Sequence, residues 1–284
     1  MKTTERFNHK PVLSYEVFPP TPASPVDKIY QTLSELAELQ PDFISVTYGA
    51  ARGTNRSETF RIAAKIKELG VESASHLTCI TTTKEDVRAK LTELKELGIE
   101  NILALRGDLP EGNFEHGDFE HASDLITFIK SEFDCFNIIA ACHPEGHLEA
   151  ESKVRDIQNL KLKVDAGANH LISQLFFSND YFYQFLERCQ LADIIVPIEA
   201  GIMPVTNKRQ IERMSSLCGA TLPPKFVTMM EKYEDNPVAM RDAGIAYAVD
   251  QIVDLFSQNV DGVHLYTMNN PYVARKIHEA VHHL

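Results

Sequence analysis

Long apolar runs, blocks of positive charge and paired cysteines are all missing from this sequence. No segment approaches the roughly 18 uninterrupted apolar residues of a membrane span, and the N-terminus, MKTTERFNHK, has no apolar core of a secretion signal. Acidic residues outnumber basic ones by 40 to 28, and no basic block stands apart from acidic neighbours. We expect no membrane partner, and no nucleic-acid partner either, because a nucleic-acid groove needs a positive stripe that displaces counterions.

The five cysteines exclude a second group of folds. They are odd in number and form no C-x-x-C pair: Cys79, Cys135, Cys142, Cys189 and Cys218. Free thiols in a reducing cytoplasm suit this pattern better than a disulfide framework or a zinc knuckle. Hydrophobic residues at 44% and charged residues at 24% are ordinary globular values, so we expect a folded, cytoplasmic protein.

Eight short apolar, β-branched runs alternate with segments of helical spacing. The runs are LSYEVF from Leu13, FISVTYG from Phe43, ESASHLTCI from Glu72, NILALRGD from Asn101, NIIAACHP from Asn137, HLISQLFF from His170, IIVPIEAGI from Ile194 and GVHLYTMN from Gly262. Each is a buried run rather than a strict alternation of apolar and polar residues. Such runs are typical of a parallel sheet covered by helices.

Two of the intervening segments carry clear helix signals. One apolar face is formed by Ile29, Leu33, Leu36 and Leu39. In another segment, Thr83 followed by Asp86 predicts a helix start. Leucines at positions 91, 94 and 97 then continue this second helix at helical spacing.

The order of these elements predicts a (β/α)8 TIM barrel rather than an open, doubly wound sheet. An open sheet would carry a Gly-rich turn, but G-x-G-x-x-G occurs nowhere and the first strand runs into the proline loop 18–22. Eight strands in about 280 residues suit a barrel, and the long gap before the last strand leaves room for an extra helix around Ala243 to Phe256. We expect one catalytic barrel domain over residues 1–284, without a regulatory domain.

Active sites of such barrels lie at the C-terminal ends of the strands. Those ends carry ionisable or hydrogen-bonding residues: Glu16, Thr47, Tyr48, His76, Arg106, Asp108, His143, Gln174, Tyr266 and Asn269. A scaffold would not need such residues there, so the pattern indicates an enzyme.

Glu16 and the segment 106–108 are the first candidates for chemistry. Apolar neighbours around Glu16 would partly desolvate its carboxyl group, which favours the protonated form and suits a general acid. Arg106 offers a planar fork to phosphate or carboxylate, and Gly107 permits close approach of a ligand to the backbone. The alternatives are a structural carboxylate paired with a barrel Lys or Arg at Glu16, and an exposed turn with a local ion pair at Arg106 to Asp108.

His143 and His147 raise the question of a metal. They are four residues apart, but Pro144 and Gly146 argue against a helix that would present both rings to one ion, and a third ligand is not evident. We expect ligand-contacting or structural histidines and no metal.

The strand-end segments resemble the methylenetetrahydrofolate reductase family in its bacterial, single-domain form. The resemblance runs from about Ser14 to Asn270. The matching segments are 16–20 (EVFPP), 46–50 (VTYGA), 76–79 (HLTC), 105–108 (LRGD), 163–169 (KVDAGAN), 174–177 (QLFF), 201–205 (GIMPV) and 266–269 (YTMN). Eight matches in one order make the resemblance specific.

The resemblance implies a barrel that binds FAD without a Rossmann motif. It implies that NADH or NADPH supplies the electrons that reduce 5,10-methylenetetrahydrofolate to 5-methyltetrahydrofolate, the methyl donor for methionine. The implied route is ping-pong: the nicotinamide nucleotide and the folate use the site in turn, and FAD carries the hydride between them. A homo-oligomer is also implied.

The resemblance assigns a role to each site residue. Glu16 matches the general acid that opens the folate ring, and Asp108 matches a carboxylate beside flavin and pterin. The FAD contacts map onto Thr47, Tyr48, Ala50, His76, Arg106, Gly107, Asp108, His121, Ala122, His143, His147, Ala150, Asp156, Asn159 and Lys163. The substrate contacts map onto Thr47, Asp108, Gln174, Gln210, Met214 and Asn270.

Five positions depart from the family pattern. His121 and His143 stand where tyrosine is usual, and an imidazole can still stack but makes the site pH-sensitive. Leu162 replaces an arginine that helps to hold FAD. Met214 replaces a phenylalanine platform, and Asn270 replaces an arginine at the glutamate end of folate.

Two other functions remain open. A non-redox lyase or isomerase could use Glu16 and Asp108 as an acid/base pair. A non-catalytic protein could bind flavin or folate without turnover. The first would be colourless and insensitive to nicotinamide nucleotides, and the second would be unaffected by loss of the Glu16 carboxylate.

Overall fold

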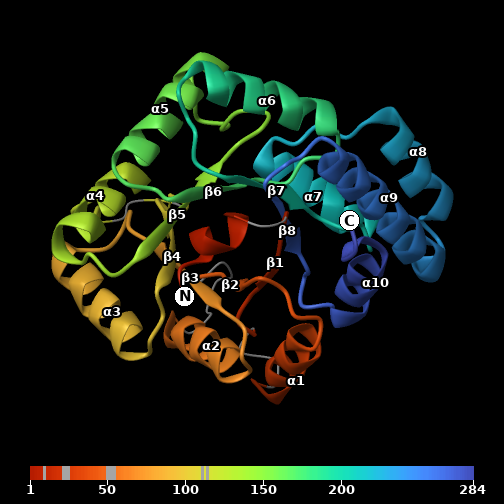
Figure 1. Ribbon diagram of the computed structural model, residues 1–284. Helices are drawn as coiled ribbons and strands as arrows, with labels where there is room; N and C mark the ends of the chain where they lie inside the picture. Colours follow the sequence, from red (N-terminus) through yellow and green to blue (C-terminus); the bar gives the residue numbers. More distant parts are fainter. Residues whose placement is uncertain (9–10, 21–25, 49–55, 110–111, 113–114) are drawn as a thin grey trace.

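Eight parallel strands pair in sequence order and close into a barrel, with the first strand hydrogen-bonded to the last (Figure 1). The computed structural model describes residues 1–8, 11–20, 26–48, 56–109, 112 and 115–284. The strands are β1 (Val12–Val17), β2 (Ile44–Val46), β3 (Ser73–Thr78), β4 (Asn101–Leu105), β5 (Asn137–Cys142), β6 (His170–Ser173), β7 (Ile198–Ile202) and β8 (Gly262–Tyr266). The predicted (β/α)8 barrel is confirmed. β7 begins at Ile198 rather than Ile194, after Pro197, which has no N–H to donate to a neighbouring strand.

Helices surround the barrel on its outside (Figure 1). They are α1 (Val26–Ala37), α2 (Arg56–Glu68), α3 (Lys84–Glu96), α4 (Ala122–Glu132), α5 (Lys153–Asp165), α6 (Asn179–Leu191), α7 (Lys208–Cys218), α8 (Pro224–Tyr233), α9 (Pro237–Ser257) and α10 (Pro271–Val281). The extra helix predicted before the last strand is present as α9 and begins earlier, at Pro237, behind the N-cap Asn236. The sequence analysis missed α8, which precedes it.

The helix signals in the sequence correspond to caps and buried faces. Thr83 accepts a hydrogen bond from the backbone N–H of Asp86 (3.1 Å) and caps α3 as predicted. Leu91 and Leu94 are buried, but the helix does not continue through Leu97 as predicted, since α3 ends at Glu96. Leu97 is the C-cap residue and is 38% exposed, because the helix ends before it can turn toward the barrel.

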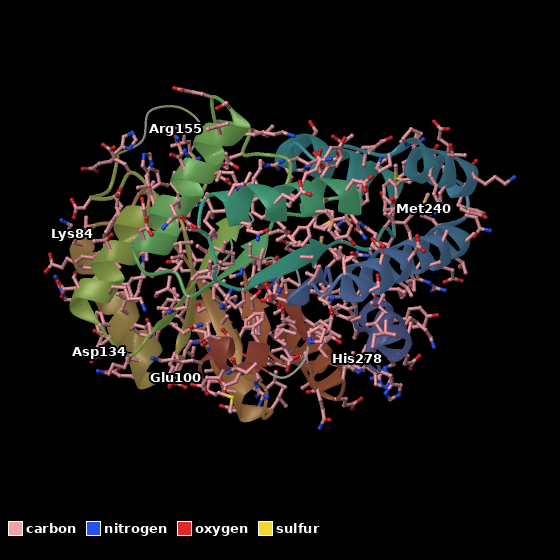
Figure 2. All side chains as sticks on the ribbon, turned by 45° about the horizontal axis from the view of Figure 1, so that its top comes forward. Lys84, Glu100, Asp134, Arg155, Met240 and His278 are labelled. Atoms are coloured by element: carbon pink, nitrogen blue, oxygen red, sulfur yellow. The ribbon has the colours of Figure 1, made fainter. Side chains whose placement is uncertain are left out.

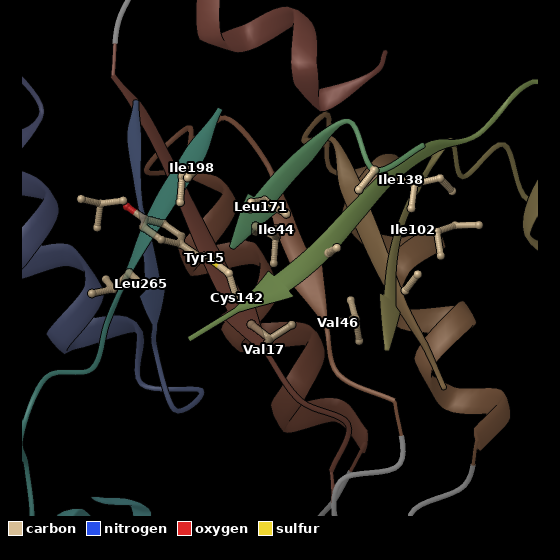
Figure 3. Close-up of a cluster of buried hydrophobic side chains, with 14 of the residues drawn as sticks. Tyr15, Val17, Ile44, Val46, Ile102, Ile138, Cys142, Leu171, Ile198 and Leu265 are labelled. Carbon is tan, nitrogen blue, oxygen red and sulfur yellow. The ribbon is translucent and has the colours of Figure 1, made fainter. Parts of the chain in front are cut away.

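The main core lies between the outward face of the strands and the helices. Alternate strand residues point into it, among them Val17, Ile44, Ile102, Leu171 and Leu265 (Figure 3). The residues between them face the barrel interior, since successive side chains of a strand point to opposite sides. The sequence did not show this alternation, because both faces are buried.

The N-terminal end of the barrel is closed by a short 3-10 helix, η1 (Thr3–Asn8), which lies inside the ring of strands in Figure 1. Its backbone N–H at Thr3 donates to the Oδ1 of Asn101 (2.8 Å), and Asn137 donates to the Thr3 hydroxyl (2.9 Å). Phe7 packs against an apolar layer inside the barrel, formed by Val12, Phe43, Ala74, Leu103, Ile139 and Ile172. Among the described residues, η1 thus covers the N-terminal end of the barrel.

Charged side chains project from the outer helices, as Lys84 and Arg155 show in Figure 2. Among the described residues, no helix combines the length and the apolar character that crossing a membrane requires.

Leu33 tests the packing of α1 on the barrel. It is completely buried, whereas Leu191 at the end of α6 is 87% exposed. We expect Leu33→Ala to lower the free energy of unfolding by about 2–5 kcal/mol, because it removes buried methyl groups and leaves a cavity. The matched control, Leu191→Ala, should change it by less than about 0.5 kcal/mol. Urea unfolding followed by circular dichroism measures both, and equal effects would contradict the assigned packing.

Candidate active site

A pocket of about 200 Å³ opens at the C-terminal end of the barrel, beside β8 and the loops that follow β1, β7 and β8. It is lined by Phe18, Pro204, Thr206, Gln210, Tyr266, Thr267, Met268, Asn270 and Val273. Two of the predicted substrate residues, Gln210 and Asn270, are therefore brought to one cavity although they are far apart in sequence. The pocket lies where the barrel fold was expected to place its site.

Glu16 lies near the end of β1, with 18% of its side chain exposed. Its Oε2 is 3.5 Å from the Nε2 of His76 and 3.6 Å from the Nε2 of His264. Burial lowers the pKa of His76 to about 4, so this imidazole is neutral at neutral pH. Among the described residues no Lys or Arg pairs with Glu16, so its carboxyl group is not held in a structural ion pair with a fixed cation.

The loop after β8 clasps the end of β1. Thr267 donates its hydroxyl to the carbonyl oxygen of Glu16 (2.6 Å). The side chain of Asn269 accepts from the N–H of Phe18 (3.1 Å) and donates to its carbonyl (2.9 Å). Met268 and Asn269 have φ values of 51° and 54°, in the left-handed region that non-glycine residues seldom adopt. The clasp holds this strained turn and fixes the position of Glu16.

The end of β4 carries a bidentate ion pair. The guanidinium of Arg106 donates to both carboxylate oxygens of Glu149 (2.5 and 2.8 Å), so the local ion pair that we weighed at this turn is present. Gly107 has a φ of 88°, and a Cβ there would lie 3.1 Å from the Cβ of Thr78. A side chain at position 107 would therefore be strained, and the glycine itself is partly exposed.

Asp108 is exposed in the loop after β4. Burial raises the pKa of the Cys218 thiol at the end of α7 to about 11, and the charge of Asp108 adds to this rise. This charge also helps to raise the pKa of Arg106. The charge of Asp108 is therefore felt both at the end of β4 and at the end of α7.

The end of β5 is a second cluster of cofactor candidates. The rings of His143 and His147 meet edge to face, with centroids 4.6 Å apart. Burial, helped by nearby Lys163, lowers the pKa of His143 to about 3. The expected pH sensitivity is therefore wrong for His143 near neutral pH, because its ring is already neutral there. Among the residues that the structure describes, no three metal-ligating side chains gather.

Lys163 of α5 turns its ammonium into the same cluster. It donates to the carbonyl oxygen of Ala141 (2.9 Å), and burial lowers its pKa. Burial raises the pKa of the neighbouring Asp156, whose carboxylate also lies near Lys163 and His147. Ala150 lies in the turn that leads from His147 to α5.

The remaining cofactor candidates lie around these clusters. Thr47 follows β2, and its buried hydroxyl has no hydrogen-bond partner in the described part of the chain. The Tyr48 ring packs toward the helices against Phe60, with centroids 6.1 Å apart, so only its backbone is left for the mouth. His121 and Ala122 begin α4, and Asn159 is exposed on α5. Ala50 lies outside the described residues.

Each substrate candidate also has a local structural role. The side-chain oxygen of Gln174, in the loop after β6, accepts from the N–H of Leu175 (2.9 Å), which fixes the amide group. Gln210 lies in the first turn of α7, and Met214 packs against an apolar cluster one turn later. Asn270 caps α10 by accepting from the N–H of Val273 (3.2 Å).

The residues at the ends of β2, β4 and β5 fit a flavin nucleotide. The unpartnered hydroxyl of Thr47 needs a polar group from a ligand, since a buried hydroxyl without a partner is costly. Arg106 and Lys163 supply positive charge for a pyrophosphate, and Gly107 leaves room for close approach. The departure at Leu162 does not disturb this cluster, because its side chain is exposed on α5.

Four polar residues inside the barrel were missed by the sequence analysis: Ser14, His170, Glu199 and His264. All four are completely buried. Burial raises the pKa of Glu199 to about 7 and lowers that of His170 to about 3. The signal that could have found two of them is polar residues two apart within an apolar strand, as at Ser14 and Glu16 or at His264 and Tyr266.

Comparisons with known proteins agree on one family. A model of the family "Methylenetetrahydrofolate reductase" matches residues 2–282. The chain is 39% identical over 259 residues to the 5,10-methylenetetrahydrofolate reductase of Escherichia coli (strain K12). This match covers 90% of this chain and 86% of the relative. The chain is 38% identical over 259 residues to the protein of that name from Pectobacterium carotovorum subsp. carotovorum, covering 90% and 85%.

Among solved structures, a protein from Clostridium thermocellum, described as binding two copies of 5-methyl-5,6,7,8-tetrahydrofolic acid, has a similar fold. The TM-score is 0.67 at 13% sequence identity, and the match covers 98% of this chain and 97% of that one. At this identity the likeness supports the barrel fold alone.

His170 provides a test of burial inside the barrel. Its pKa falls from the ordinary value of 6.5 to about 3 on folding, so below pH 6.5 the unfolded chain binds the extra proton. This contribution to stability is complete above pH 6.5 and is lost as the pH falls toward 3. As the pH is lowered, the free energy of unfolding should fall less steeply in His170→Gln than in the parent. We expect the two slopes to differ by up to about 1.4 kcal/mol per pH unit.

Urea unfolding at pH values between 4.5 and 7 measures this difference for both proteins. Lost packing in the variant lowers its free energy of unfolding equally at every pH and leaves the slope unchanged. Parallel curves for the parent and the variant would contradict the assignment of a neutral, buried His170.

Proposed function

The chain belongs to the methylenetetrahydrofolate reductase family, and on that premise we propose that it reduces 5,10-methylenetetrahydrofolate to 5-methyltetrahydrofolate with electrons from NADH or NADPH and with FAD as cofactor. The observation that carries the proposal is the placement of Glu16. It is a mostly buried carboxyl group at the C-terminal end of β1, beside the neutral imidazole of His76 and without a Lys or Arg partner among the described residues. Such a group is suited to give up a proton to a ligand in the mouth.

FAD, when bound, would take a hydride from the nicotinamide nucleotide and deliver it to the folate. Arg106 and Lys163 would hold its pyrophosphate, Thr47 would hydrogen-bond to it, and the backbone at Gly107 would lie against it. For Arg106 this means exchanging the carboxylate of Glu149 for phosphate oxygens, which offer the same bidentate geometry.

Glu16 is the proposed general acid. The methylene carbon of the folate bridges two nitrogens and accepts hydride only after protonation of one of them opens the ring to an iminium cation. Glu16 would donate that proton to the bridging nitrogen, and the clasp from Thr267 holds the strand end in place while it does so. Asp108, exposed at the mouth, would stabilise the positive charge of the opened ring.

The folate and the nicotinamide nucleotide would use one site in turn. Gln210 and Asn270 line the same pocket, which begins beside Phe18, two residues after Glu16. Gln174 has its amide fixed by the N–H of Leu175 and would hydrogen-bond to the pterin. Met214 would give this pocket a softer platform than an aromatic ring. Use of one pocket by the two compounds in turn would give the ping-pong order.

The proposal extends to the cellular setting. The methylated product would supply methyl groups for methionine synthesis. All five cysteines are unpaired, which fits the reducing cytoplasm. The barrel would act as the catalytic domain, assembled into a homo-oligomer.

The visible spectrum of the purified protein, with FAD added where needed, tests the cofactor directly. We expect a flavin spectrum that NADH or NADPH bleaches without oxygen and that methylenetetrahydrofolate restores, and the more effective nucleotide identifies the donor. A protein that neither carries nor takes up FAD would overturn the reductase and favour a non-redox lyase or isomerase.

Glu16→Gln separates the two halves of the reaction. The variant should let a nicotinamide nucleotide bleach the flavin at nearly the parent rate, whereas restoration by methylenetetrahydrofolate should fall by at least about 100-fold, because the general acid is lost. Stopped-flow absorbance measures both steps. Glu231→Gln, on the exposed face of α8, is the matched control and should behave like the parent. A near-normal folate step in Glu16→Gln would exclude Glu16 as the acid.

A further inference from the structure

A line of polar side chains runs from Glu16 into the closed interior of the barrel. The Nδ1 of His264 lies 2.6 Å from the hydroxyl oxygen of Ser14. Its Nε2 lies 3.3 Å from the hydroxyl oxygen of Ser45 and 3.6 Å from the Oε2 of Glu16, so a small approach of the two side chains would bring Glu16 within hydrogen-bond distance.

Ser14 in turn lies 2.6 Å from the Oε1 of Glu199. The other oxygen of Glu199, Oε2, faces the Nε2 of His170 at 3.5 Å. The proposed reaction uses only Glu16 from this line.

Solvent reaches this line at one end only. Ser14, His264, Glu199 and His170 are completely buried, and Glu16 alone is partly exposed, at the mouth. The Oε2 of Glu199 and both ring nitrogens of His170 have no hydrogen-bond partner in the described part of the chain. An ionised carboxylate with an unpartnered oxygen is costly inside a protein, so Glu199 favours its protonated form.

The hydroxyl proton of Ser14 can point in only one direction at a time. If Ser14 donates to an ionised Glu199, then His264 donates from Nδ1 to Ser14, and its bare Nε2 faces a protonated Glu16. If a protonated Glu199 donates to Ser14, then Ser14 donates to Nδ1, and the Nε2–H of His264 faces an ionised Glu16. Both arrangements contain the same number of protons and differ only in which carboxyl group holds one.

We propose that Glu199 is a buried proton store for Glu16, connected to it through Ser14 and His264. In the transfer, the carboxyl proton of Glu199 passes to Ser14, the Ser14 proton passes to Nδ1 of His264, and the Nε2 proton passes to Oε2 of Glu16. Glu199 becomes ionised, Glu16 becomes protonated, and no other bond changes. The inference rests on the proposed function of Glu16 as the general acid.

The surroundings of Glu199 suit a store at neutral pH. Its pKa is raised to about 7, chiefly by burial, and the carboxylates of Asp42 and Asp261 raise it further. The hydrogen bond from Ser14 and the nearby His264 act in the opposite direction. Glu199 therefore holds a proton over much of the range in which Glu16 must be supplied.

Three other titratable groups near the two carboxyl groups are neutral near neutral pH. Burial lowers the pKa values of His76, beside Glu16, and of His170, beside Glu199. Tyr266, on β8 between them, has its pKa raised well above the usual value by burial and by the charge of Glu16. None of these three competes for the stored proton near neutral pH. Ser45 lies beside the line, with its hydroxyl oxygen 3.3 Å from the Nε2 of His264 and 3.3 Å from the Nε2 of His76.

The store has a consequence for pH dependence. Two linked carboxyl groups lose their protons in two shared steps, and a singly protonated line can still present its proton at Glu16. The folate step of the parent should therefore persist to a higher pH than the titration of an isolated Glu16 would allow. A substrate that covers the mouth would not cut Glu16 off from its proton source.

Glu199→Gln removes the store and keeps the size of the side chain. The rate of the folate step is expected to fall as the pH rises. With FAD bound, we expect this fall to move to lower pH by about one unit or more in the variant, so that its rate is roughly tenfold lower at the pH where the parent rate is half-maximal. The bleaching of the flavin by the nicotinamide nucleotide should keep its pH profile. A folate step with an unchanged pH profile in this variant would overturn the proposal.

Ser14→Ala cuts the connection and leaves both carboxyl groups. It should shift the alkaline limb in the same direction as Glu199→Gln. Ser73→Ala is the matched control, because Ser73 is also a fully buried strand serine but lies on β3, with no hydrogen bond to this line. If Ser14→Ala keeps the parent profile while Glu199→Gln does not, the two carboxyl groups interact only through their charges and the relay is overturned.

Carbon-13 NMR of the glutamate carboxyl groups tests the linkage without any folate chemistry. In the full-length protein without folate, the resonances of Glu16 and Glu199, assigned from Glu16→Gln and Glu199→Gln, should each move in the same two pH steps. In Ser14→Ala each should move in a single step of its own. Single, separate steps in the parent would overturn the store.

This measurement also separates the two proposals. A normal folate step in Glu16→Gln would remove the general acid whatever the NMR titration shows. Separate titrations of the two carboxyl groups would remove the store even if Glu16 is confirmed as the acid.

Discussion

The two-residue alternation of side chains along the strands is the constraint on which this structure depends. In a closed barrel, one set of alternate residues must face the helices and the other must face the interior. The outward set is mostly apolar and forms the main core with the helices. The inward set is apolar only near the N-terminal end, where η1 and Phe7 close the barrel. Above that layer the interior is free to be polar.

Polar residues in a closed interior acquire unusual protonation. His76 and His170 are held neutral and the pKa of Glu199 is raised to about 7, because the burial that excludes water penalises charge. Glu16 is placed at the border between this interior and the mouth. It can therefore meet a ligand on one side and neutral, proton-exchanging groups on the other. The chemistry proposed for the family requires a carboxyl group in such a position.

On the cofactor side of the mouth, the features that suit a ligand are positive charge and a glycine backbone. Arg106 and Lys163 are the cations nearest the ends of β4 and β5, and Gly107 adds no side chain beside them. Glu149 satisfies Arg106 with a carboxylate, the same acceptor geometry that a phosphate offers. In a chain with a net charge of −12, such cations are needed locally if an anionic cofactor is to bind.

The sequence by itself determined the barrel, the order of its elements, the cap at Thr83 and the strand ends at which Glu16, Arg106, Asp108 and His143 lie, because apolar runs and cap residues act locally. Only the tertiary structure decided which inward residues meet. Ser14, Glu199 and His264 are far apart in sequence and come within hydrogen-bond distance through barrel closure. The exposure of Leu97, the outward turn of the Tyr48 ring and the neutrality of His143 likewise depend on neighbours from other elements. Burial and proximity are properties of the assembled barrel, and a run of strand residues does not contain them.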